Sequence, residues 1–231
     1  MFGVRLGIIG AGNISRKHLE VIRAIEWIDA VGITSRSRSK AEKLASEFSI
    51  DFVSDNPTEL VDTVDPDALM VLVSANQIFS VTKNIIKFKL PFFVEKPPGL
   101  SPDETRLLAD LAQENGVLNM VGFNRRYYSI FQKGLEFINR NGGLLGIAVE
   151  GHERFWEISI RDIPNEIREG WIFGNSTHTF DLLRFFGGEI ESINTLSKSL
   201  KEKNGDQFVA SIEFESGALG TYTSHWFSPG G

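Results

Sequence analysis

The feature that most constrains the fold is a glycine turn near the N-terminus, between an apolar strand and a helix. Residues 4–9 form a short β-branched run that ends at Gly10, and segment 14–25 carries apolar residues at helical spacing. Gly10 permits a tight turn, Gly12 lets a phosphate approach the backbone, and Ser15 is small enough for close helix packing. The segment predicts a dinucleotide-binding turn; a glycine turn without a ligand is the alternative.

The alternation of strand and helix continues through the first half of the chain. Apolar strands are predicted at 30–34, 68–73, 92–94 and 117–121, and helices at 39–48, 80–88 and 102–115. Ser39 with Glu42, and Ser101 with Glu104, have the spacing of helix-capping residues. Strands that are apolar throughout are typical of a parallel sheet buried on both faces. Residues 1–122 are therefore predicted to form a doubly wound α/β domain of the Rossmann type.

The residues after the second predicted strand bear on the choice between NAD and NADP. An acidic residue there would hold the ribose 2′-hydroxyl, but this chain has Ser35 and Arg36, followed by Arg38 and Lys40. A hydroxyl and a guanidinium suit a 2′-phosphate better than a diol. The sequence thus favours NADP slightly over NAD, with cations on a solvated helix start as the alternative.

The pattern changes after residue 122. Helices are predicted at 129–139 and 175–186, and strands at 145–150, 190–196, 207–214 and 218–226. Ser216 and Gly217 form the turn between the last two strands. Residues 123–231 are therefore predicted to be an α+β domain with a mostly antiparallel, open sheet.

Composition narrows the range of partners. The 231 residues include 24 Lys plus Arg, 30 Asp plus Glu and no Cys, which gives a formal charge of −6. This acidic balance argues against nucleic acid and anionic membranes as partners, because both need a basic surface. No apolar run approaches the ~18 residues of a spanning helix, and no metal-ligand spacing is visible. We expect a cytoplasmic protein with a small-molecule partner and no metal.

Two motifs at the ends of later strands add a family resemblance. Glu95-Lys96-Pro97 follows the strand at 92–94, and Gly122-Phe123-Asn124-Arg125-Arg126 follows the strand at 117–121. With the glycine turn, they resemble the Gfo/Idh/MocA oxidoreductases, which are NAD(P)-dependent and act mostly on sugars, inositols and nucleotide sugars. The resemblance runs along the whole chain and implies that Lys96 lies beside the nicotinamide and the reacting hydroxyl. A cation at the carboxyl end of a sheet strand can polarise an oxygen or relay a proton.

One of the four histidines lies in a segment that resembles a family motif. His178 opens a segment similar to the family's His-x-x-Asp-Leu, which implies a general acid/base; a structural helix-start histidine is the alternative. His18 is predicted to be a packing residue, and His152 and His225 to be structural residues in strands. The chain departs from the family at Gly174, where many members carry Asp, and in the loop 74–79, which lacks the usual Pro and His. A non-catalytic NAD(P)-binding protein is therefore the alternative to a dehydrogenase.

The predicted site residues form three groups. Lys96 and His178 are the catalytic candidates. The cofactor candidates are Gly10, Gly12, Asn13, Ile14, Ser35, Arg36, Ser74, Asn76, Glu95 and Lys96. The substrate candidates are Lys96, Asn124, Arg126, Trp156, Asn175 and His178. In the last group, aromatic rings suit sugar faces and arginine forks suit carboxylates or phosphates, although packing and salt bridges between domains are equally good explanations.

The resemblance also bears on the C-terminal half. Typical relatives place the segment at 224–231 well inside their second domain, so we expect a shortened family member or an incomplete version of a longer protein. The same family often uses one face of the second-domain sheet as its oligomer interface. The uncovered face predicted here therefore suggests a homo-oligomer.

Overall fold

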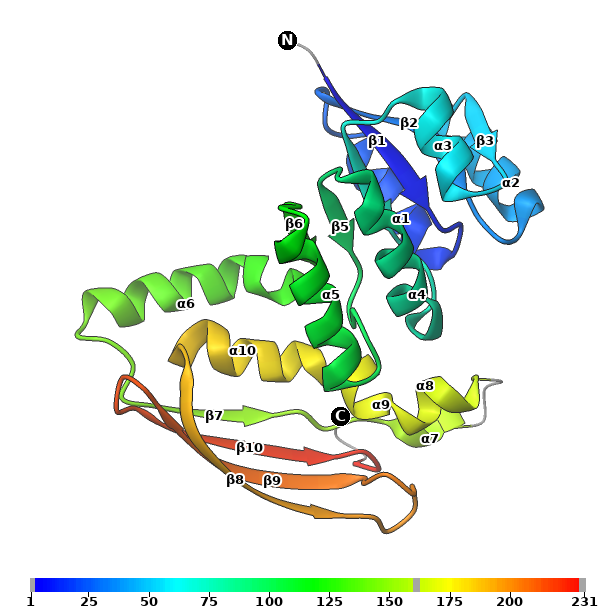
Figure 1. Ribbon diagram of the computed structural model, residues 1–231. Coiled ribbons are helices and arrows are strands. Elements are labelled where there is room, and N and C mark those ends of the chain that lie inside the picture. The colour runs from blue at the N-terminus through cyan, green and yellow to red at the C-terminus, as the bar shows by residue number, and fades with distance from the viewer. Residues whose placement is uncertain (1–2, 160–162, 229–231) are drawn as a thin grey trace. The chain divides into compact units, whose positions relative to one another are not determined.

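The computed structural model describes residues 3–159 and 163–228 of the chain (Figure 1). It divides into two compact units, Met1–Gly122 and Phe123–Gly231. None of the described helices is long and apolar enough to cross a membrane. The final residues of the predicted C-terminal segment, 229–231, lie outside the described part.

The first unit is built on a six-stranded parallel sheet with the strand order β3-β2-β1-β4-β5-β6. The strands are β1 (Val4–Ile9), β2 (Ile28–Thr34), β3 (Phe52–Ser54), β4 (Ala68–Val71), β5 (Phe92–Val94) and β6 (Asn119–Val121). The helices are α1 (Asn13–Ile22), α2 (Arg38–Phe48), α3 (Pro57–Val64), α4 (Ala75–Ile85), the 3₁₀ helix η1 (Ile86–Phe88) and α5 (Pro102–Glu114). The order reverses between β1 and β4, which is where ligands bind in sheets of this type.

Two hydrophobic clusters show which helices cover each face of this sheet. One cluster joins the strands to α1 and α2 through residues such as Leu19 and Leu44. The other joins them to α3, α4 and α5 through Leu60, Ile78 and Leu108. The sheet is therefore buried on both sides, as the apolar strands predicted, and the doubly wound α/β prediction is confirmed.

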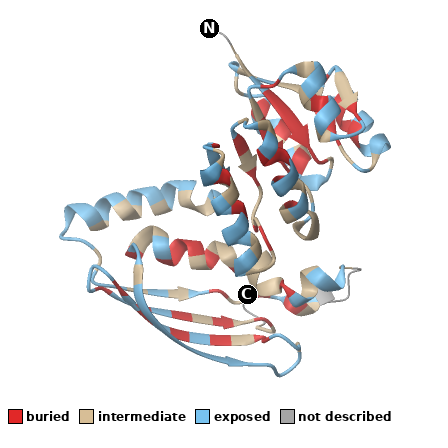
Figure 2. Cartoon of the chain, in the orientation of Figure 1, coloured by how far each residue is buried: buried red, intermediate tan, exposed pale blue. Residues whose placement is uncertain are grey.

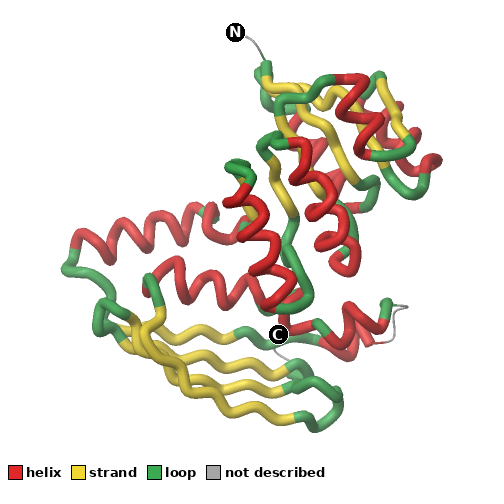
Figure 3. Tube along the Cα trace, viewed as in Figure 1, coloured by secondary structure: helices red, strands yellow, loops and turns green. Residues whose placement is uncertain are grey.

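The second unit carries a four-stranded mixed sheet with the order β7-β10-β9-β8 (Figure 3). Its strands are β7 (Gly146–Glu150), β8 (Ile190–Lys198), β9 (Gln207–Phe214) and β10 (Leu219–His225). Its helices are η2 (Asn124–Tyr127), α6 (Ser129–Arg140), α7 (Phe155–Ser159), α8 (Asn165–Glu169), α9 (Trp171–Gly174) and α10 (Thr177–Gly187). β7 pairs with β10 in parallel and the other pairs are antiparallel, so the mostly antiparallel prediction is confirmed.

Burial alternates along the strands of this second sheet. In β9, Phe208, Ala210, Ile212 and Phe214 are buried, whereas the residues between them are exposed. The buried face shows as red segments of β9 and β10 in Figure 2 and packs against α10 through Leu183. The opposite face is open among the described residues and includes Ile193, Val209 and Leu219 as exposed apolar side chains.

Several local predictions are wrong. No elements were predicted between 49 and 67, yet β3 and α3 lie there, because Asn56 accepts a bond from the Glu59 amide at 2.9 Å and starts a short helix. Helix α2 begins at Arg38 after the N-cap Ser37, so the capping box predicted at Ser39 is not used. Helix α4 begins at Ala75 and not at residue 80, because the Ser74 carbonyl already accepts bonds from the next turn.

Candidate functional site

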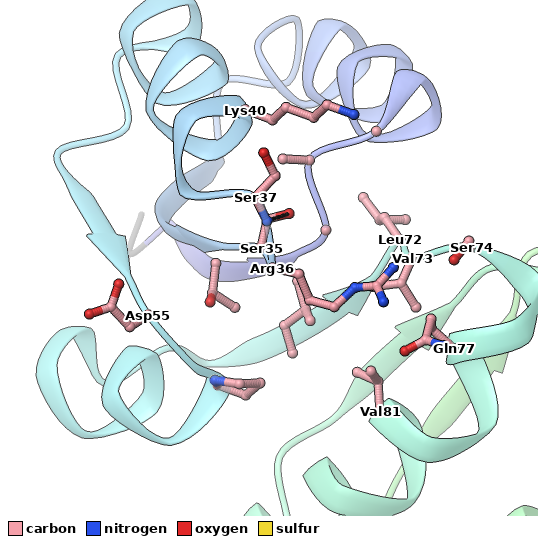
Figure 4. A pocket seen from close by; sticks show the side chains of 16 residues that line it. Ser35, Arg36, Ser37, Lys40, Asp55, Leu72, Val73, Ser74, Gln77 and Val81 are labelled. Atoms are coloured by element: carbon pink, nitrogen blue, oxygen red, sulfur yellow. Dashed lines mark hydrogen bonds between the residues drawn. The ribbon is translucent and has the colours of Figure 1, made fainter.

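A cleft of about 350 Å³ opens at the carboxyl ends of β1, β2 and β4 (Figure 4). That volume lies within the range of small-molecule sites. Its lining residues come from the ends of β1 and β2, the turns after β1, β2 and β4, the turn between β3 and α3, and the first turns of α2, α3 and α4. They are Ile9, Gly10, Ala11, Gly12, Thr34, Ser35, Arg36, Ser37, Lys40, Asp55, Pro57, Leu72, Val73, Ser74, Gln77 and Val81. The cleft therefore includes Gly10, Gly12, Ser35, Arg36 and Ser74 of the predicted cofactor group.

Gly10 holds the turn after β1 in a conformation that only glycine adopts easily. Its φ is +120°, and a Cβ at this position would lie 2.3 Å from the carbonyl oxygen of Leu72. Its amide donates to the Thr34 carbonyl at 2.8 Å, and the Leu72 amide donates to Ile9 at 2.7 Å. The turn is thereby fixed between the ends of the two neighbouring strands.

Ser15 fastens the start of α1 to the same place. The Gly12 amide donates to its hydroxyl at 3.2 Å, and the hydroxyl donates to the Leu72 carbonyl at 3.4 Å. Ser15 is fully buried, as expected of a small residue where a third glycine is common. A Cβ at Gly12, in contrast, would meet no atom within 4 Å. The backbone is open at Gly12, so the turn fits a pyrophosphate.

The cations near the cleft separate into two kinds. Arg36 and Lys40 line it, and the Arg36 side chain extends across it toward Val73 and Gln77 in Figure 4. Arg38 is not among the lining residues; it pairs with Asp55, which lines the cleft, and with Glu42, and these contacts raise the pKa of Arg38. The position of Arg36 is the one expected of a residue that meets the adenosine end of a dinucleotide.

Other cofactor candidates lie outside the lining of this cleft. Asn13 and Ile14 are the first residues of α1, where backbone amides have no partner inside the helix. Asn76 accepts a bond from the Ser74 hydroxyl at 2.9 Å in the first turn of α4. The apolar wall formed by Leu72, Val73 and Val81 was not predicted. Leu72 and Val73 directly follow β4, and Val81 lies in α4.

His18 packs against Phe93, as predicted for a packing residue, but it also has a carboxylate partner that the sequence did not indicate. Its Nε2 lies 2.7 Å from a carboxylate oxygen of Glu95, and its ring meets Phe93 edge-on at 5.3 Å. This hydrogen bond was not predicted because Glu95 is 77 positions away in sequence, and no local pattern pairs the two residues. Glu95 and Lys96 directly follow β5, at the carboxyl edge of the sheet.

The remaining candidates belong to the second unit. His178 is the second residue of α10, and its amide donates to the Asn175 carbonyl at 3.4 Å, so these two residues share one turn. Asn124 is exposed at the start of η2, and Trp156 is half-buried in α7. Lys96 lies in the first unit and His178 in the second.

Sequence reasoning missed a buried carboxylate at the start of α10. Glu153 accepts hydrogen bonds from the Trp171 indole and from the hydroxyl of Ser176, the N-cap residue, the latter at 2.9 Å. Nearby, Thr179 and Tyr222 share a hydrogen bond of 3.1 Å, and burial raises the pKa of the Tyr222 phenol. Glu153 therefore anchors the turn that leads to His178.

Arg126 is already occupied by a carboxylate of its own chain. It donates from Nε at 2.7 Å and from Nη2 at 2.5 Å to the two oxygens of the buried Asp181, and this contact raises the pKa of Arg126. A bidentate fork of this kind fixes η2 against α10. The geometry favours the structural explanation for Arg126 over binding of a ligand anion.

His152 and His225 form a stacked pair, which the sequence did not predict. Their ring centroids are 5.1 Å apart, and the His225 amide donates to Nδ1 of His152 at 3.2 Å. His152 follows the end of β7, so its placement in a strand was wrong. No group of three or more acidic or histidine residues that could hold a metal occurs in the described ranges.

Comparison with known proteins identifies the family. Residues 4–123 match the oxidoreductase family with an NAD-binding Rossmann fold, and residues 150–231 match the C-terminal domain of Gfo/Idh/MocA proteins. The chain belongs to the Gfo/Idh/MocA family. This confirms the resemblance seen in the glycine turn, in Glu95-Lys96-Pro97 and in the His178 segment.

Individual Gfo/Idh/MocA proteins are similar over nearly all of this chain. A scyllo-inositol 2-dehydrogenase (NAD(+)) of Bacillus subtilis is 27% identical over 99% of the chain, and a myo-inositol 2-dehydrogenase of Thermotoga maritima is 27% identical over 94%. The structure of GenD2 from gentamicin A biosynthesis, in complex with NAD, is similar with a TM-score of 0.82 and 24% sequence identity. The matched region covers 100% of this chain and 68% of the GenD2 chain. The chain spans 64% to 69% of the length of the first curated relatives.

Proposed function

We propose that this Gfo/Idh/MocA protein is an NAD(P)-dependent dehydrogenase that oxidises a ring hydroxyl of an inositol or a related sugar. The observation that carries the proposal is the open backbone at Gly12, in a cleft where Gly10 is locked by its neighbours. Relatives named for oxidation of inositols support the substrate class. A bound dinucleotide would supply the hydride acceptor for this reaction.

The roles proposed for the protein's own residues follow from their chemistry. The first-turn amides of α1, with Gly10 and Gly12, bind the pyrophosphate. His178 takes the proton of the reacting hydroxyl, and Lys96 polarises the same oxygen. Asn124, Trp156 and Asn175 orient the substrate through hydrogen bonds and ring contact.

The test of this function is turnover. Purified protein is mixed with NAD⁺ or NADP⁺ and a panel of polyols that includes scyllo-inositol, myo-inositol and glucose, and absorbance of the reduced dinucleotide is followed. Oxidation of at least one cyclic polyol is expected. Dinucleotide binding with no oxidation across the panel would instead support the non-catalytic alternative.

The proposed cofactor preference is NADP over NAD, because Arg36 lines the cleft and no acidic residue stands at the end of β2. Arg36→Ala should weaken NADPH binding about tenfold, the value of one charge-assisted phosphate contact, and leave NADH binding near wild type. Calorimetric titration of both dinucleotides measures the change. Lys43→Gln, which removes an exposed charge of α2 outside the cleft, is the matched control. Tighter binding of NADH than of NADPH by the wild type would contradict the preference.

The proposed assembly is a homo-oligomer that covers the open sheet face, in a cytoplasmic setting. Ile193, Val209 and Leu219 are exposed on strands β8, β9 and β10. Replacing Val209 and Leu219 by Asp should dissociate the assembly, because two charges would be buried at the contact. Light scattering after size-exclusion chromatography gives the mass of each species. A wild-type protein that elutes as a monomer would rule this assembly out.

A further inference from the structure

The contact between His18 and Glu95 links two segments that the proposed reaction uses separately. His18 belongs to α1, whose N-terminus faces the cleft, and Glu95 directly precedes Lys96. The two side chains are only 25% and 15% exposed, and their polar atoms are 2.7 Å apart. Because a carboxylate only accepts, the His18 imidazole donates this hydrogen bond from Nε2.

The second oxygen of Glu95 holds the backbone of Lys96. It accepts a hydrogen bond from the Lys96 amide at 3.1 Å. The Glu95 amide itself still pairs with the Val71 carbonyl at 3.0 Å. The carboxylate therefore fixes the peptide unit between Glu95 and Lys96, which carries the Lys96 side chain.

The surroundings leave little freedom to either partner. A Cβ at Gly122 would lie 3.4 Å from Glu95 Oε2 and 2.8 Å from the Phe93 ring, so the Gly122 backbone lies close against this carboxylate. The His18 ring meets Phe93 edge-on. One turn earlier in α1, Ser15 is bonded to the Leu72 carbonyl. The His18 ring is therefore held by Glu95 and Phe93, and the helix that carries it is held at Ser15.

We propose that His18 is a positioning residue for Lys96: it holds the Glu95 carboxylate, which in turn holds the peptide that carries Lys96. The proposal rests on the role of Lys96 in the proposed dehydrogenase reaction. It makes one rigid connection between the helix that receives the pyrophosphate and the amine that meets the reacting oxygen. Misplacement of a reacting group by about 1 Å can cost about 100-fold in rate.

A matched pair of variants separates hydrogen bonding from packing. His18→Phe keeps a ring against Phe93 but cannot donate, whereas His18→Gln keeps an N–H donor near the position of Nε2. With the polyol of highest wild-type rate, His18→Phe should lower kcat about 10- to 100-fold, as loss of supporting hydrogen bonds does at other sites. His18→Gln should recover most of the rate, and KM for the dinucleotide should stay near wild type in both. Glu20→Gln, on the exposed side of α1, is the control.

A second measurement needs neither dinucleotide nor substrate. Acetylation of the Lys96 amine by an N-hydroxysuccinimide ester, followed by peptide mass spectrometry, reports how firmly this segment is held in the free protein. Acetylation should be faster in His18→Phe and in Glu95→Gln than in the wild type and His18→Gln. Glu95→Gln serves as an independent variant, because an amide cannot accept both hydrogen bonds.

The outcomes distinguish the inference from the function on which it rests. Absence of turnover in the wild type would overturn the proposed dehydrogenase activity, while the acetylation rates would still test the contact. Wild-type rates of both turnover and acetylation in His18→Phe would overturn the positioning role. Equal losses in His18→Phe and His18→Gln would likewise overturn it, because the donor would then be irrelevant.

Discussion

Replacing Lys96 or His178 by alanine is expected to lower kcat about 1,000-fold, within the range of general acid–base contributions. Lys96 follows β5 at the ligand edge of the sheet, and His178 lies in the first turn of α10, where Asn175 and the Glu153–Ser176 contact fix the backbone. Neither residue lines the adenosine side of the cleft. Dinucleotide affinity should therefore remain near wild type in both variants.

The measurement is steady-state turnover with the polyol identified in the panel, together with calorimetric titration of the dinucleotide. His178→Gln keeps a polar side chain of similar reach but cannot transfer a proton at neutral pH, so it should be as slow as His178→Ala. Lys17→Ala removes an exposed lysine of α1 and should keep the wild-type rate. Loss of dinucleotide affinity with an unchanged kcat would refute the catalytic roles.

Alanine is expected to have different effects at two glycines of the same turn: it should lower the stability of the fold at Gly10 and the affinity for the dinucleotide at Gly12. Gly10→Ala places a methyl group 2.3 Å from a backbone oxygen at a φ of +120°, and should destabilise the fold by about 3 kcal/mol or more. Gly12→Ala meets no neighbour and has an ordinary φ of −91°, so the fold should keep its stability. Its methyl group nevertheless occupies the space through which a pyrophosphate would approach, and binding should fall by about tenfold or more.

Thermal unfolding without ligand and dinucleotide titration together read out both effects. For a chain of this size, 3 kcal/mol corresponds to a fall in Tm of roughly 6–12 °C. Gly12→Ala should unfold within a few degrees of the wild type and bind weakly. Tight dinucleotide binding by Gly12→Ala would mean that the pyrophosphate does not lie on this turn.

The sequence predicted the features that repeat locally. Apolar strands alternating with helices gave the doubly wound sheet, and the glycine turn gave the position of the cleft. The unpredicted elements β3 and α3 are short, and α3 depends on one capping contact of Asn56. A weak periodic signal of this length does not stand out from loop sequence.

What escaped prediction is the pairing of side chains that are far apart in sequence. The sequence indicates Arg126 as a ligand-binding residue, but its guanidinium is paired with Asp181, which lies 55 positions later. The sequence around His18 indicates a packing residue and does not reveal the hydrogen bond that Glu95 accepts from it. No motif links Glu153 to Ser176. Such contacts depend on how the helices and strands pack, and residue spacing along the chain does not predict them.

The Ser15 hydroxyl, between the Gly12 amide and the Leu72 carbonyl, has a consequence for the energetics of ligand capture. A glycine at this position would leave the turn free to sample many shapes in the absence of ligand, and that freedom would be lost on binding. Here the serine has already restricted the turn. The conformational entropy of the turn is therefore lost on folding and not on ligand binding, so a phosphate would bind to a turn that is already ordered.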